Sequence, residues 1–172
     1  LVSSSAASDV YKRQVGNSFG EAYFKAQRAA GVILPKTGNV FISVRDKDKP
    51  LVCDVAEELI KIGFSLYATR GTQVYLEEKN IKCKRINKVK QGHPHIVDMI
   101  KNGDVHLIIN TTEGAVSIKD SFSIRKEANN NNVCLTTTIS GAKAFCKAIL
   151  FIDNFDVLDI ESRHASLKTS SH

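Results

Sequence analysis

Apolar residues in this chain follow two patterns, short unbroken runs and positions spaced three or four residues apart. Unbroken runs of about four to eight residues are typical of buried strands, whereas the wider spacing is typical of one face of a helix. The two patterns alternate, and the runs predict strands at residues 40–44, 64–68, 84–87, 105–110 and 133–136. Strands that alternate with helices form mostly parallel sheets through right-handed crossovers. We therefore expect an α/β fold with a five-stranded, mostly parallel sheet.

Turn and capping residues set the expected limits of the helices. Pro50 suits the first position of a helix and Gly63 suits the position after its end, which places Lys49 at the N-cap. A short helix is expected to begin at Thr72, and Pro94 is expected in the first turn of the next one. The remaining helices are expected at residues 120–129 and, after Thr138 as N-cap, at residues 139–150.

The two ends of the chain differ from this alternating part. Residues 9–14 match the translation of a transposon end used in sequencing adapters, so residues 1–15 are interpreted as adapter-derived or disordered, with a natural polar terminus as the alternative. Residues 16–34 predict a helix from the end of a truncated upstream domain, followed by a linker. Residues 35–160 form the main predicted domain, and residues 161–172 a polar tail.

Composition narrows the classes of function. With 172 residues and 42% apolar side chains, the chain is long enough for one domain with a core and short for two. Its net charge of +6 favours an anionic partner, whether nucleotide, phosphorylated metabolite or nucleic acid. The four cysteines form no CxxC pair, which fits a reducing compartment. No run of about 18 apolar residues could span a bilayer, so we expect a cytoplasmic protein with no membrane partner.

Short polar side chains follow three of the predicted strands. In an open α/β sheet the carboxyl ends of parallel strands meet at one edge, where ligands bind. Hydroxyl, amide and ammonium groups at such an edge, with the free N–H groups of a following helix, suit a phosphate. Each motif alone could merely cap or turn the chain, with Gly71 allowing a tight turn. Together they predict a phosphate site formed by Lys49, Thr69, Gly71, Thr72, Lys88, Asn110, Thr111 and Thr112.

Lys49 gives a separate indication of an anion. An ammonium group at an N-cap supplies no capping oxygen and faces the positive end of the helix dipole. A bound anion between them would remove this conflict, although a solvated lysine is an equally simple explanation.

Several segments, in order, resemble a known family. The segments are residues 43–49, 68–72, 87–95 and 108–114. They resemble the C-terminal allosteric domain of the glutamine-hydrolysing carbamoyl phosphate synthetase large chain, and residues 18–27 resemble the end of that chain's second ATP-grasp unit. The resemblance implies a methylglyoxal-synthase-like three-layer fold, with helices on both faces of the sheet.

The resemblance also implies ligands. Bacterial members bind UMP as an inhibitor and IMP as an activator, and they bind ornithine at the junction with the synthetase. By motif position, the nucleotide would contact Ser43, Lys49, Thr69, Thr72, Lys88, Asn110, Thr111 and Thr112. A possible second-effector segment consists of Leu135, Thr136 and Thr137, but it lacks the carboxylate that the family places there, which argues against amine recognition.

On the same resemblance, the chain is a regulatory fragment without a catalytic site or cofactor of its own. Its parent would make carbamoyl phosphate from glutamine, bicarbonate and ATP, with Mg²⁺ or Mn²⁺, for pyrimidine and arginine biosynthesis. The expected partners are a UMP-like or IMP-like nucleotide, the upstream synthetase domains and the glutaminase small subunit.

Two other functions stay open. Methylglyoxal synthase shares the fold, but its chemistry needs a carboxylate base. This chain keeps neither the family's aspartate in residues 91–94 nor its histidine in residues 118–121. A nucleic-acid-binding module could use a basic stretch that has no interleaved aromatic residues for base stacking, formed by Lys82, Lys84, Arg85, Lys88 and Lys90. His93 and His95 could indicate a metal, but without a nearby cysteine or carboxylate cluster we expect none.

Overall fold

The structure is a computed structural model that describes residues 19–29, 31, 33–87, 92–111 and 115–152. It contains two compact units, each described by itself below. The larger unit spans Val32–Lys143, and the smaller one combines Leu1–Gly31 with Ala144–His172.

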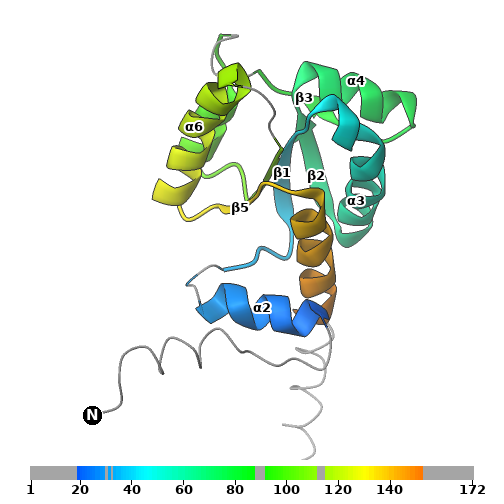
Figure 1. The fold of residues 1–172 in the computed structure, drawn as a ribbon, viewed down its shortest axis with the longest axis vertical. Coiled ribbons are helices and arrows are strands. Elements are labelled where there is room, and N and C mark those ends of the chain that lie inside the picture. Colours follow the sequence, from blue (N-terminus) through cyan, green and yellow to red (C-terminus); the bar gives the residue numbers. More distant parts are fainter. Residues whose placement is uncertain (1–18, 30, 32, 88–91, 112–114, 153–172) are drawn as a thin grey trace, which may run out of the picture. The chain divides into compact units, whose positions relative to one another are not determined.

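A single parallel sheet organises the larger unit (Figure 1). Within the described residues its order is β3-β2-β1-β4-β5, and every neighbouring pair runs parallel, which confirms the predicted sheet. The strands are β1 (Gly38–Ser43), β2 (Phe64–Ala68), β3 (Lys84–Arg85), β4 (Leu107–Asn110) and β5 (Cys134–Thr136).

The strand order reverses between β1 and β4. From β1 the chain adds β2 and then β3 on one side, and it returns to place β4 and β5 on the other side. This reversal makes the carboxyl ends of β1 and β4 the topological switch point, where open α/β sheets bind ligands. The register pairs Ser43 with Asn110 at this point, and Ile42 with Ala68 on the β2 side.

Helices cover both faces of the sheet, which confirms the three-layer fold. In Figure 1, α3 and α6 lie on opposite sides of the strands. The apolar residues of β1 alternate between the faces, as strand geometry requires, and Phe41 belongs to a buried cluster with residues of α5 and α6. The helices of this unit are α3 (Lys49–Ile62), α4 (Arg70–Glu78), α5 (Ile96–Lys101) and α6 (Ala115–Asn130), with a one-turn 3₁₀ helix, η1, at Asp46–Asp48.

Several helix limits differ from the sequence-based ones. The N-cap of α3 is Asp48, so the placement of Lys49 at the N-cap was wrong. Helix α4 begins at Arg70 instead of Thr72, because Thr69 ends the extended backbone of β2 and becomes the N-cap. Pro94 lies ahead of α5, whose N-cap is His95. Gly63 ends α3 in a left-handed conformation, as predicted.

The smaller unit contains α2 (Phe19–Ala29) and the later part of a helix over residues 139–152. Gly20 is buried against the second helix, since a Cβ placed on it would lie 2.7 Å from the Lys147 carbonyl oxygen. The rings of Phe24 and Phe151 lie 6.3 Å apart, centroid to centroid. Across all described residues, none of the helices has both the length and the apolar character needed to cross a membrane.

Candidate functional site

Three buried hydroxyl groups meet where β1 and β2 end. Thr69 Oγ1 lies 3.4 Å from Ser43 Oγ and 3.5 Å from Thr72 Oγ1. The Val44 N–H donates to Thr72 Oγ1 over 3.4 Å. The side chains come from β1, the β2–α4 junction and the first turn of α4. The parallel pairing of β1 and β2 thus brings together residues that are distant in sequence, and we call Ser43, Thr69 and Thr72 the hydroxyl cluster.

The hydroxyl cluster is not a helix cap. Thr69 occupies the N-cap of α4, yet its side chain makes no capping hydrogen bond. An N-cap threonine that serves only the helix would accept from one of the first N–H groups. The observed geometry therefore argues against the simpler interpretation in which these threonines merely start a helix.

Gly71 lies inside the first turn of α4 and not in a tight turn ahead of it. It is not among the glycines with a positive φ, so the expectation that it permits an unusual turn was wrong. A Cβ placed on it would lie 3.5 Å from Lys49 Nζ. The absence of a side chain at this position instead leaves space between the ammonium group and the start of α4.

Lys49 reaches the same end of the sheet from α3. Its side chain is 18% exposed, and its Nζ lies 2.7 Å from Asp46 Oδ1. The nearby ammonium pulls the pKa of the Asp46 carboxyl below its ordinary value, first through the hydrogen bond and then through charge attraction. Although the N-cap argument for Lys49 was wrong, the structure does bring its ammonium beside Gly71.

Asn110 and Thr111 complete the described part of the site at the end of β4. Asn110 is 2% exposed, and its Nδ2 has no hydrogen-bond partner among the residues that the structure describes. A buried donor without an acceptor costs about 1–3 kcal/mol, so it needs an explanation. Thr111 Oγ1 accepts from the Arg45 N–H over 3.2 Å. These contacts place the hydroxyl of Thr111 against the residues that follow β1.

Asp48 is a site residue that the sequence reasoning missed. It is buried, and its Oδ2 accepts from Arg45 Nε over 2.6 Å. Burial alone would raise the pKa of this carboxyl, but hydrogen bonds from Arg45 and Thr111, together with the positive charges of Arg45 and Lys47, hold the pKa below its ordinary value. The spacing of three residues between Arg45 and Asp48 was the available signal, because one 3₁₀ turn brings such residues together.

Two predicted site residues, Lys88 and Thr112, lie outside the described residues. Two residues of the possible second-effector segment, Leu135 and Thr136, have structural roles. Leu135 packs against the core cluster, and the buried Thr136 donates through Oγ1 to the Thr138 carbonyl oxygen over 3.1 Å. Thr137 is exposed.

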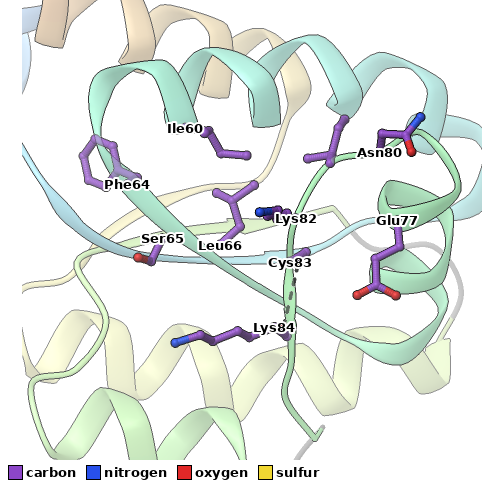
Figure 2. Close-up of a pocket in the computed structure, with 10 residues that line it drawn as sticks. Ile60, Phe64, Ser65, Leu66, Glu77, Asn80, Lys82, Cys83 and Lys84 are labelled. Atoms are coloured by element: carbon purple, nitrogen blue, oxygen red, sulfur yellow. Dashed lines mark hydrogen bonds between the residues drawn. The ribbon is translucent and has the colours of Figure 1, made fainter.

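A hollow of about 740 Å³ lies elsewhere on the larger unit (Figure 2). Its lining includes Phe64, Leu66 and Cys83, and none of the predicted phosphate-site residues. Phe64 begins β2, whereas Thr69 follows the end of that strand, so the hollow opens near the opposite end of β2. Lys82 and Lys84 also line it, and Lys84 Nζ lies 5.5 Å from the centroid of the Tyr67 ring. This exposed sheet edge offers basic groups without a described row of aromatic side chains for stacking bases.

Comparison with known proteins agrees with the fold. Residues 51–137 match the family model described as MGS-like domain. The chain belongs to the MGS-like domain family. The chain is also similar to the carbamoyl phosphate synthase large chains of Pseudomonas putida and Pseudomonas syringae pv. tomato, each 51% identical over 154 residues. The large chain of Ralstonia nicotianae is 47% identical over 154 residues.

These relatives are much longer than this MGS-like chain. The matched segment covers 89–90% of the chain and 14% of each of the three large chains. The similarity therefore concerns only a small part of those proteins.

Proposed function

We propose that the larger unit is the regulatory domain of a carbamoyl phosphate synthase large chain and that it binds a nucleoside monophosphate of the UMP or IMP type. The nucleotide phosphate would occupy the carboxyl ends of β1, β2 and β4. The observation that carries the proposal is the buried amide of Asn110 at the topological switch point, which has no partner within the described part of the chain. A phosphate or ribose oxygen of the nucleotide would accept its hydrogen bond.

Charge and hydroxyl groups around Asn110 support an anionic ligand. The hydroxyl cluster and the ammonium of Lys49 reach the same edge of the sheet from β1, α3 and α4. Hydrogen bonds to a charged group are worth about 1.5–3 kcal/mol each, so a few of them suffice for a micromolar nucleotide. Lys88 and Thr112 would add contacts from the segments after β3 and β4.

The lowered pKa of Asp48 favours a site that binds its ligand without catalysing a reaction. A general base works best when its pKa lies near the working pH. The Asp48 carboxyl is the buried carboxylate nearest in sequence to Lys49, and its pKa is held below the ordinary value by Arg45 and Thr111. A carboxylate held in this way is a poor base for the proton abstraction that a methylglyoxal synthase needs.

In the parent protein, this domain would transmit nucleotide binding to the upstream synthetase domains, which carry the ATP and Mg²⁺ or Mn²⁺ sites. The parent would pair with a glutaminase subunit in the cytoplasm and serve pyrimidine and arginine biosynthesis. A coupling free energy of about 1–3 kcal/mol between the nucleotide and the synthetase would be enough for regulation. The domain itself would contain no catalytic site and no cofactor.

Calorimetric titration of the purified chain with UMP, IMP and ornithine tests the proposal. We expect binding of at least one nucleotide, and we expect Lys88→Ala to weaken it about tenfold through loss of a charge-assisted contact. Lys101→Ala, which removes an exposed lysine from the end of α5, is the charge-matched control and should bind normally. Absence of nucleotide binding, or equal affinity in both variants, would contradict the proposed site. Phosphate release from dihydroxyacetone phosphate would support the lyase instead.

A further inference from the structure

Three side chains of metal-ligating type converge at the start of α5. Asp98 Oδ2 lies 2.7 Å from His93 Nδ1 and 3.2 Å from His95 Nδ1. One ligand atom from each of the three residues can be chosen so that all lie within 4.8 Å of one another. The sequence-based expectation of no metal did not take account of Asp98, which the first turn of α5 brings next to the two histidines.

Two of the three residues are held in place by the backbone. His95 is the N-cap of α5, where its N–H donates to Asp98 Oδ2 over 2.9 Å and its Nδ1 accepts from the Asp98 N–H over 3.3 Å. His95 is also buried and forms a parallel bridge with Asn87. These contacts hold the His95 and Asp98 side chains next to each other before any metal arrives, which reduces the entropy cost of binding. A metal at His95 Nδ1 would replace the hydrogen bond from the Asp98 N–H, because this nitrogen has a single lone pair.

His93 is not needed for this helix cap. Its side chain is 77% exposed, and its ring lies 4.4 Å from the ring of His95, centroid to centroid. An exposed ion pair with Asp98 would contribute little to stability. A second imidazole directed at the same carboxylate is therefore poorly explained by stability alone.

We propose that His93, His95 and Asp98 bind one divalent transition-metal ion, with Zn²⁺ as the best fit. Two imidazole nitrogens and one carboxylate suit zinc, whereas Mg²⁺ and Ca²⁺ prefer oxygen ligands. Metal–ligand bonds of about 2.0–2.2 Å in a tetrahedral site put the ligand atoms about 3.3–3.5 Å apart. The separation of 3.2 Å between His95 Nδ1 and Asp98 Oδ2 is already close to this value, and a small rotation of the exposed His93 ring would lengthen the 2.7 Å separation to it.

The site would leave zinc one position for water or another ligand. A cation near a helix N-terminus is opposed by the helix dipole, and the negative charge of Asp98 offsets this. The proposal does not depend on nucleotide binding, because none of the three residues belongs to the predicted phosphate site.

Calorimetric titration of the chain with Zn²⁺ tests the site, with an expected stoichiometry of one ion per chain. Loss of partners outside the coordination sphere already costs about 10–100-fold in metal affinity, so His93→Ala should weaken binding at least about tenfold. Because His93 is exposed, this variant should keep its circular dichroism spectrum and melting temperature. Asp98→Asn, which keeps an acceptor for the cap but removes the charge, should also bind zinc more weakly.

The matched control replaces His164 and His172 together by alanine, which removes two imidazoles outside the cluster. This variant should bind Zn²⁺ as the unaltered chain does. Co²⁺ in place of zinc should give no thiolate charge-transfer band, which excludes the cysteines as ligands. The proposal is overturned if zinc does not bind, if His93→Ala binds it equally well, if the control loses binding, or if a thiolate band appears.

Discussion

Asn110 shows how a single residue can connect fold and function. Its position at a strand end and its polar type could be predicted from the sequence. The lack of a partner for its amide among the described residues could not, because it depends on which groups of β1 and β5 lie beside β4 in the folded sheet. Asp48 was missed for a related reason, since its role comes from contacts with Arg45 and Thr111 and not from any hydrophobic pattern.

Substitution of Gly71 should affect ligand binding and stability differently. In Gly71→Ala the new methyl group would lie about 3.5 Å from Lys49 Nζ, in space that a phosphate would use. Replacing a helical glycine by alanine contributes up to about 1 kcal/mol of stability when nothing clashes. We therefore expect an unchanged or higher free energy of unfolding in urea together with clearly weaker UMP binding by calorimetry. Normal UMP affinity in this variant would place the phosphate elsewhere.

One buried thiol, Cys134, and one half-buried thiol, Cys83, should make stability depend on alkaline pH. Burial raises the pKa of Cys134 to about 11 and is the first cause that raises the pKa of Cys83 to about 12. A pKa that is higher in the folded state stabilises the fold at low pH, and the benefit is lost as pH rises past the unfolded value toward the folded one.

We therefore expect the free energy of unfolding to fall between pH 9.0 and about 11, and the fall to be smaller in Cys134→Ala. Urea denaturation at several pH values measures the free energy of unfolding of the unaltered chain and of the variant. An equal fall in the two chains would show that Cys134 contributes nothing to it.

At the scale of elements, the sequence predicted which segments are helices and strands better than where they begin. β2 has the predicted limits because its apolar run is bounded by Gly63 and Thr69. The predicted starts of α3 and α4 were displaced because they were set from Pro50 and from a turn at Gly71, whereas the N-caps are Asp48 and Thr69, whose residue types suit that position. The η1 turn has three residues, too few to show any periodicity.

The contact of α2 with the helix over residues 139–152 depends on Gly20. Gly20→Ala would place a methyl group about 2.7 Å from the Lys147 carbonyl oxygen, closer than atoms normally approach. Such overpacking costs about 1–3 kcal/mol, more than the helix propensity of alanine returns.

We expect faster amide hydrogen exchange across α2 in this variant. Arg28→Ala introduces alanine at an exposed position of the same helix and should leave exchange almost unchanged. If exchange across α2 stays slow in both variants, the two helices can move apart to accept the new methyl group at little cost in free energy.

A ligand at the proposed site should raise the free energy of unfolding of the larger unit. The reason is that only the folded sheet brings together the groups from three strand ends. A ligand at about 100 times its Kd adds about 2.7 kcal/mol to the free energy of unfolding. UMP should therefore raise the melting temperature by several degrees, measured by differential scanning calorimetry. Uridine, which lacks the phosphate, should have little effect, and equal shifts for the two would argue against phosphate recognition.

The short β3 has a consequence for how this protein behaves at high concentration. An edge strand offers unpaired N–H and C=O groups to the edge of any other sheet, and natural proteins limit this hazard with short, charged edges. β3 has only two residues, Lys84 and Arg85, both exposed. Two chains that met along this edge could form few main-chain hydrogen bonds and would bring like charges together. Lys84 and Arg85, which belong to the basic stretch that suggested nucleic-acid binding, can therefore limit aggregation.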